Sequence, residues 1–134
     1  IIARTSRENG SPVIGIITRH IAHMGRSSRQ PTELITAESM GERKQRLIDN
    51  GDIIVALPGG IGTIDELFDA LTGKMLGHHD KPIVICNTQG IFDSLLQQIE
   101  HLRAQHFLRY DKPNLYHIVS DARACCELLD QYNR

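Results

Sequence analysis

The sequence predicts an α/β fold in which helices cover both faces of an open parallel sheet. Two observations support this. Segments typical of strands alternate with helical segments along the whole chain. The runs at residues 53–57 and 82–86 are nearly continuously apolar, as in strands that are covered on both faces. The length of 134 residues fits one domain, so we expect a single domain over residues 1–134.

The first half of the chain predicts four elements. We expect a helix over residues 1–9 that stops at Gly10, strands at 13–18 and 34–36, and a helix from 39 to about 50. Ser39 and Glu42 have the spacing of a capping box, which indicates where the last of these helices begins.

The second half predicts six more elements. We expect strands at 53–57, 82–86 and near 118–119, each followed by a helix, at 63–76, 91–107 and 122–132. The helix at 63–76 has an apolar face of Ile64, Leu67, Phe68, Leu71 and Met75. Ligand sites in such sheets lie at the carboxyl ends of the strands, which indicates residues 18–19, 58–63 and 87–90.

Composition excludes several classes of function. The formal net charge is −1, so we expect no nucleic-acid partner and no affinity for a membrane surface. No apolar run is long enough to span a membrane, and the first ten residues do not resemble a signal peptide. The three cysteines have no metal-type spacing, which favours reduced thiols and a cytoplasmic location. We expect His78 and His79 to lie in a solvated loop, and we expect no metal and no cofactor.

A glycine loop follows the apolar strand directly. Pro58, Gly59, Gly60, Ile61, Gly62 and Thr63 precede a helix whose first N–H groups suit an anion such as a phosphate. The loop is neither a Walker A sequence nor a GxGxxG motif. A tight connection that needs small residues is the alternative interpretation.

Two further groups of residues have both a structural and a functional interpretation. Thr63 and Glu66 form a second possible capping box, but the Glu66 carboxylate also fits beside a sugar attached to the bound phosphate. Arg43 and Lys44 share a helix face with Met40, three and four residues earlier. Their charged end groups either extend to water or point into an anion pocket, where pairing with Glu66 is possible.

Together these motifs resemble the LONELY GUY (LOG) family of cytokinin riboside 5′-monophosphate phosphoribohydrolases, often labelled lysine decarboxylase-like. The resemblance rests on residues 40–44, 56–66 and 76–82, which include the Arg-Lys pair and a PGGxGTxxE motif, and it extends over residues 1–108. It implies a three-layer Rossmann-like fold, a homodimer, and hydrolysis of a nucleoside 5′-monophosphate to free base and ribose 5-phosphate.

The resemblance also implies roles for individual residues. Arg43 and Glu66 match the catalytic arginine and glutamate of the family. The remaining matches bind substrate: Met40, Lys44, Pro58, Gly59, Gly60, Ile61, Gly62 and Thr63. Asp65 replaces a frequent Glu, while Gly73 and Met75 replace frequent Trp and Gln residues, which bears on base preference. The family's first strand and its GGGxxGLMG loop have no counterpart ahead of Ile1, so we expect the chain to lack that part.

Two other functions use the same loop. Molybdenum-cofactor carrier proteins have a similar PGGxGT sequence, so a non-catalytic carrier of a phosphorylated ligand is one alternative. An inactive nucleotide-sensing homologue is the other. Lysine decarboxylation is not expected, because that reaction needs pyridoxal phosphate and no acidic partner for this cofactor is recognisable.

Overall fold

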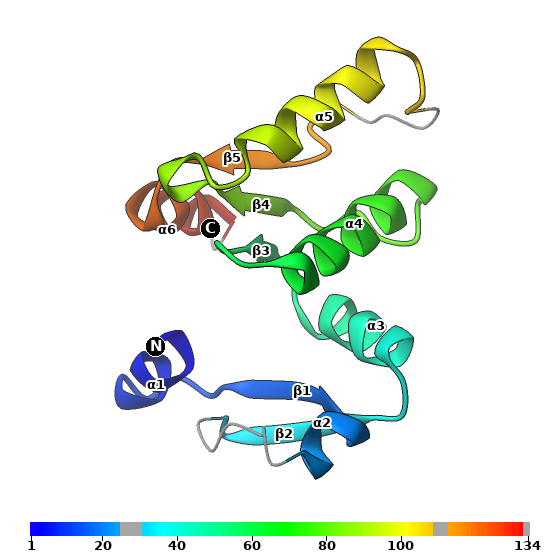
Figure 1. The fold of residues 1–134 in the computed structure, drawn as a ribbon. Helices are drawn as coiled ribbons and strands as arrows, with labels where there is room; N and C mark the ends of the chain where they lie inside the picture. The colour runs from blue at the N-terminus through cyan, green and yellow to red at the C-terminus, as the bar shows by residue number, and fades with distance from the viewer. Residues whose placement is uncertain (25–30, 109–112, 133–134) are drawn as a thin grey trace. The chain divides into compact units, whose positions relative to one another are not determined.

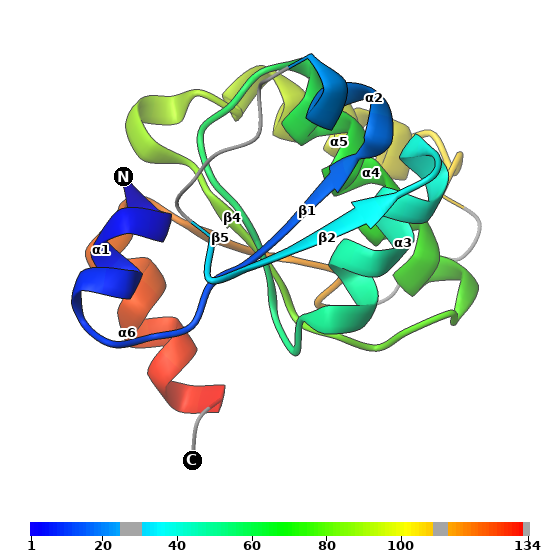
Figure 2. The same ribbon diagram turned by 90° about the horizontal axis from the view of Figure 1, so that it is seen from below.

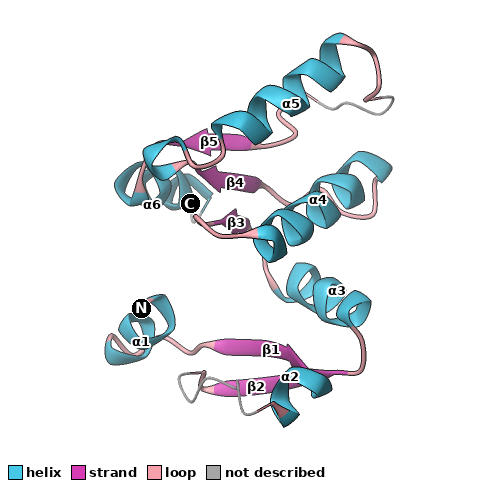
Figure 3. Ribbon diagram, viewed as in Figure 1, coloured by secondary structure: helices cyan, strands magenta, loops and turns pink. Residues whose placement is uncertain are grey.

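The computed structural model describes residues 1–24, 31–108 and 113–132. These residues form two compact units, 1–51 and 52–134. All paired strands are parallel and helices pack around them, so the α/β fold class is confirmed (Figures 1 and 3). The single domain expected from the length stays a prediction. None of the helices described is long and apolar enough to cross a bilayer.

The first unit contains a two-stranded sheet and three helices. In chain order these are α1 (Ile2–Glu8), β1 (Ile14–Thr18), α2 (Arg19–His23), β2 (Glu33–Ala37) and α3 (Met40–Asn50). The strands pair in register from Ile14 with Glu33 to Thr18 with Ala37. The short helix α2 was not predicted. The Thr18 hydroxyl accepts a hydrogen bond from the Ile21 N–H at 3.4 Å and caps it.

The second unit contains a three-stranded sheet in the order β3-β4-β5. Its elements are β3 (Ile54–Ala56), α4 (Ile61–Leu76), β4 (Ile83–Cys86), the 3-10 turn η1 (Thr88–Gly90), α5 (Asp93–Ala104), β5 (His117–Val119) and α6 (Ala122–Tyr132). Helices α4 and α5 lie on one side of this sheet and α6 lies on the other (Figures 1 and 2). This is the three-layer arrangement expected from the sequence.

The core of the second unit is centred on β4. All four residues of β4 are buried, so the continuous apolar run at 83–86 reports burial on both faces. Val84 and Cys86 pack with Val119 and Cys125, beneath α6. The apolar run at 53–57 behaves differently. Only Ala56 in β3 is buried, because β3 lies at the edge of its sheet as described.

Candidate functional site

The glycine loop leads from the carboxyl end of β3 into α4. Helix α4 begins at Ile61 with Gly60 as its N-cap, two residues earlier than predicted. The Gly60 carbonyl accepts hydrogen bonds from the N–H groups of Thr63 at 3.0 Å and Ile64 at 3.2 Å. Because the N-cap residue is a glycine and has no side chain, it offers no side-chain cap to the helix. The predicted capping box is therefore wrong: Thr63 lies inside the helix, and Glu66 lies in its second turn rather than its first.

The three glycines of the loop have different structural requirements. A Cβ on Gly59 would lie 2.1 Å from the Thr63 hydroxyl oxygen, so only glycine fits there. A Cβ on Gly60 or Gly62 would meet no atom within 4 Å, and neither residue has a positive φ. The tight-connection interpretation therefore explains Gly59 alone. Open space borders the backbone at Gly60 and Gly62.

The first turn of α4 offers hydrogen-bond donors at this open space. The N–H groups of Ile61 and Gly62 precede the first helical acceptor, and no acceptor for them lies in the ranges that the structure describes. The partial positive charge of the helix N-terminus lies at the same place. Such a combination suits a phosphate or another anion.

Glu66 lies one turn further along the same helix. It is half-buried, four residues after Gly62 and therefore on the same face of α4. At 1.5 Å of rise per residue, its backbone lies about 6 Å along the helix axis from that of Gly62. A carboxylate and an anion-binding backbone are thus neighbours on one helix.

Arg43 and Lys44 lie in α3, in the first unit. Both are half-buried, as are Leu47 and Ile48. Met40, at the first position of the helix, is exposed, so it does not extend a buried apolar stripe to that end of the helix. The Arg43 Nε donates to the carbonyl oxygen of Ile16 in β1 at 2.9 Å. The approach of Arg43 to Glu66, which lies in the second unit, stays a prediction.

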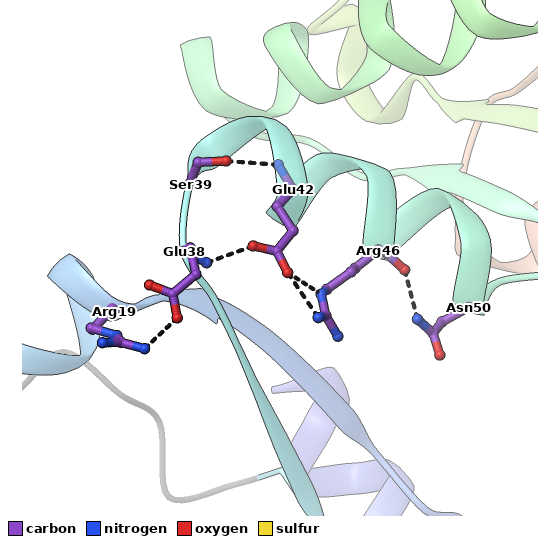
Figure 4. A network of polar contacts seen from close by, with 6 residues as sticks. All are labelled: Arg19, Glu38, Ser39, Glu42, Arg46 and Asn50. Carbon is purple, nitrogen blue, oxygen red and sulfur yellow. Dashed lines mark hydrogen bonds and ion pairs between the residues drawn. The ribbon is translucent and has the colours of Figure 1, made fainter.

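A polar network fixes the beginning of α3 (Figure 4). The Ser39 hydroxyl accepts from the Glu42 N–H at 3.1 Å, as predicted. The Glu42 carboxylate accepts from the N–H of Glu38 at 2.8 Å, one residue earlier than in a standard capping box. Arg46 donates to the same carboxylate, and Glu38 pairs with Arg19. The Glu38 amide, and then Arg46, lower the pKa of Glu42. The network therefore holds the helix turn that carries Arg43 and Lys44.

The loop after β4 borders the glycine loop, because β3 and β4 pair in parallel and their carboxyl ends share one sheet edge. The Asn87 side chain organises this loop. Its oxygen accepts from the Phe92 N–H at 2.8 Å, and its nitrogen donates to Asp93 at 2.7 Å. The sequence indicated residues 87–90 only by the rule for strand ends and did not single out Asn87.

The histidines and cysteines differ in their exposure and contacts. The described ranges contain no group of three metal-ligating side chains. His78 is exposed as expected, whereas His79 is half-buried and its ring bonds to the Ala70 carbonyl oxygen at 3.0 Å. All three cysteines are free thiols, with Cys86 and Cys125 buried and Cys126 exposed.

Comparison with known proteins identifies the family to which this chain belongs. Residues 1–129 match the sequence model of the family described as "Possible lysine decarboxylase". The chain is 43% identical over 94 residues to a cytokinin riboside 5′-monophosphate phosphoribohydrolase of Mycobacterium tuberculosis, covering 70% of this chain and 50% of that protein. It is 31% identical over 134 residues to a probable enzyme of the same name in Oryza sativa, covering all of this chain and 60% of that protein. A relative of that name in Rhodococcoides fascians is 34% identical over 108 residues, covering 80% of this chain and 54% of that protein. The chain thus spans between half and two thirds of the length of these relatives.

Proposed function

The chain belongs to the family described as possible lysine decarboxylases, whose relatives named above are phosphoribohydrolases, and on this premise we propose that it hydrolyses nucleoside 5′-monophosphates. The substrate would be AMP or a cytokinin riboside 5′-monophosphate, and the products would be a free base and ribose 5-phosphate. The observation that carries the proposal is the open backbone at Gly60 and Gly62, with Glu66 one turn along the same helix.

The 5′-phosphate binds to the first turn of α4. The N–H groups of Ile61 and Gly62 donate to its oxygens, and the segment from Pro58 to Thr63, which includes the first turn of α4, surrounds it. Gly62 is helical and alanine would suit the fold better there, so a glycine at this position fits a ligand that approaches the backbone closely. Binding energy at the phosphate then orients the distant C1′–N bond.

The chemical step needs stabilisation of a developing positive charge on the ribose. As the C1′–N bond breaks, the Glu66 carboxylate stabilises the oxocarbenium-like ring electrostatically and positions the attacking water. The water oxygen forms the new bond to C1′, and the departing base takes up a proton. Arg43 holds Glu66 or the sugar and assists the leaving base, while Lys44 and Met40 contribute to substrate binding. No cofactor is needed for this reaction.

Two features of the wider proposal follow from the same family. We place the enzyme in the cytoplasm, where nucleoside monophosphates are available and its three thiols stay reduced. It acts as a homodimer, which is supported by the large exposure of the apolar side chains Ile61 and Phe68 on α4.

Product analysis tests the function. The protein is incubated with AMP and with isopentenyladenosine monophosphate, and the free base is measured by chromatography. Glu66→Gln removes the negative charge at constant size, so we expect kcat to fall by a factor of about 100 to 1,000. Asp65→Asn is the matched control, because the neighbouring carboxylate Asp65 is exposed and points to a different side of the helix.

Two outcomes would contradict the proposal. A folded Glu66→Gln protein with full activity would remove the assigned carboxylate from the mechanism. Tight binding of AMP without release of base would instead favour the non-catalytic carrier.

A further inference from the structure

The loop that follows β4 contains a backbone feature that its own packing does not explain. Gln89 and Gly90 have φ angles of 57° and 69°, and the Ile91 N–H bonds to the Thr88 carbonyl oxygen at 3.4 Å. Two successive residues with positive φ inside a four-residue turn are the pattern of a type I′ turn. Asn, Asp and Gly are favoured at its first central position, and Gln is not.

The other two non-glycine residues with positive φ in the described ranges have a local explanation. His106 follows the end of α5, where Phe107 bonds back to Leu102 and His106 bonds back to Arg103, each at 3.0 Å. This is the Schellman motif, which requires a left-handed residue at that position. Asn114 is of a residue type that tolerates the conformation. Gln89 has neither explanation.

The neighbours of Gln89 are each fixed by a structural contact. Asn87 holds the start of α5, and the Thr88 hydroxyl contacts the Cys86 sulfur at 3.4 Å. Gly90 combines its positive φ with a position where a Cβ would lie 2.4 Å from an Asp93 oxygen. The Gln89 side chain is exposed, and among the residues that the structure describes it has no polar partner. A strained residue that the fold does not use indicates a functional constraint.

The position of Gln89 in the sheet indicates what this functional constraint is. The loop lies at the carboxyl end of β4, and the glycine loop lies at the carboxyl end of β3, one strand spacing of about 4.8 Å away. A nucleotide whose phosphate binds to the first turn of α4 therefore has its other end free to reach the neighbouring loop. A carboxamide carries no charge and offers a donor and an acceptor side by side, which matches the edge of an adenine ring.

We propose that Gln89 is a specificity residue that binds the edge of the nucleobase, held in place by the strained turn at residues 88–91. This inference rests on the proposed hydrolysis of nucleoside 5′-monophosphates. The backbone strain at Gln89 lowers the stability of the fold somewhat, and the turn fixes the residue that carries the amide at the base end of the site.

The test compares stability with binding in the same variants. Gln89→Asn and Gln89→Gly both suit the turn, so we expect a melting temperature no lower than that of the native protein, and a higher one for Gln89→Asn. Both shorten or remove the amide, so we expect KM for AMP to rise about tenfold. Gln105→Ala, at the opposite end of α5, is the matched control and leaves KM unchanged.

Ribose 5-phosphate separates the base from the rest of the nucleotide. It contains the sugar and the phosphate alone, so its affinity, measured by calorimetry, should be the same for the native protein and Gln89→Gly. An unchanged KM for AMP in both Gln89 variants, or an equal loss of ribose 5-phosphate binding, would overturn the assignment. If the native protein itself releases no base from AMP, the proposed function fails instead.

Discussion

At the scale of single residues, Gly59 and Gly62 show that glycines in one loop have different purposes. Gly59→Ala forces a Cβ against Thr63, so we expect a loss of about 1–3 kcal/mol in the free energy of unfolding.

Gly62→Ala adds a good helix former where there is room. We therefore expect the free energy of unfolding to rise by up to about 1 kcal/mol, together with weaker binding of AMP. Urea denaturation and calorimetry measure the two effects. If Gly62→Ala bound AMP as well as the native protein does, the phosphate would not lie at this turn.

The sequence predicted where the glycine loop lies, but it did not predict the structural role of each residue in it. The PGGxGT motif correctly indicated a loop between a strand and a helix. It did not separate Gly59, which the fold needs, from Gly60 and Gly62, which it does not. Nor does a sequence report φ angles, so the strained turn at Gln89 had no signal.

At the scale of elements, the end of α4 is tied to the segment that leads into β4. Helix α4 ends in a Schellman motif, with Gly77 at a φ of 81° and His78 bonded back to Gly73. Gly73 has no side chain, and the His79 ring packs where a Cβ would lie 3.2 Å from it. The buried Lys74 donates from Nζ to the Lys81 carbonyl oxygen at 3.0 Å. The contact with His79 gives a structural reason for glycine at position 73.

This junction makes stability depend on pH. The Lys81 N–H donates to His79 Nδ1, so Nε2 carries the proton and donates to Ala70, and the ring is neutral. Burial lowers the pKa of His79 most and outweighs the Ala70 carbonyl, which raises it. The smaller effects of Lys81 and Lys74 also lower it, so the pKa of His79 lies below its ordinary value. The unfolded chain therefore binds a proton before the folded chain does, and stability falls as pH drops below about 6.5.

A histidine-to-glutamine comparison checks this dependence. We expect the melting temperature to fall between pH 7.5 and pH 5.5 in the native protein, and to fall less in His79→Gln. His78→Gln changes an exposed neighbour and should retain the native profile. Identical profiles for His79→Gln and the native protein would show that other groups cause the dependence.

The elements and boundaries that the sequence missed have different local causes. The carbonyl of Gly60 begins α4 without a polar side chain, so no capping signal marked Ile61 as its first residue. Helix α2 has five residues, too few for an apolar periodicity. Long segments such as α3, α4 and α6 were predictable because their apolar residues recur at helical spacing in the sequence. Even there, Phe68 was expected in the core of α4 and is 39% exposed, while Lys74 is buried.

At the scale of the whole molecule, the exposed face of α4 predicts the assembly. Ile61 is 87% exposed and Phe68 lies seven residues later, two turns along the same face. We expect light scattering to give twice the mass of one chain, and Phe68→Asp to shift the protein toward the monomer because a charge would be buried at the interface. A Phe68→Ser variant that stays as strongly dimeric as the native protein, or a native monomer at micromolar concentration, would contradict this expectation.

The distribution of the three thiols makes the packing of α6 on the sheet directly measurable. Cys126 is exposed, while Cys86 in β4 and Cys125 in α6 share one apolar cluster, where burial raises the pKa of Cys125. An alkylating reagent should therefore modify one cysteine at once and the other two only when α6 separates from β4. Mass spectrometry after timed pulses would count the modified sites, and a single rate for all three would contradict the expectation. The modification rate of the two buried native thiols thus measures how often α6 separates from β4, and no cysteine has to be introduced for the experiment.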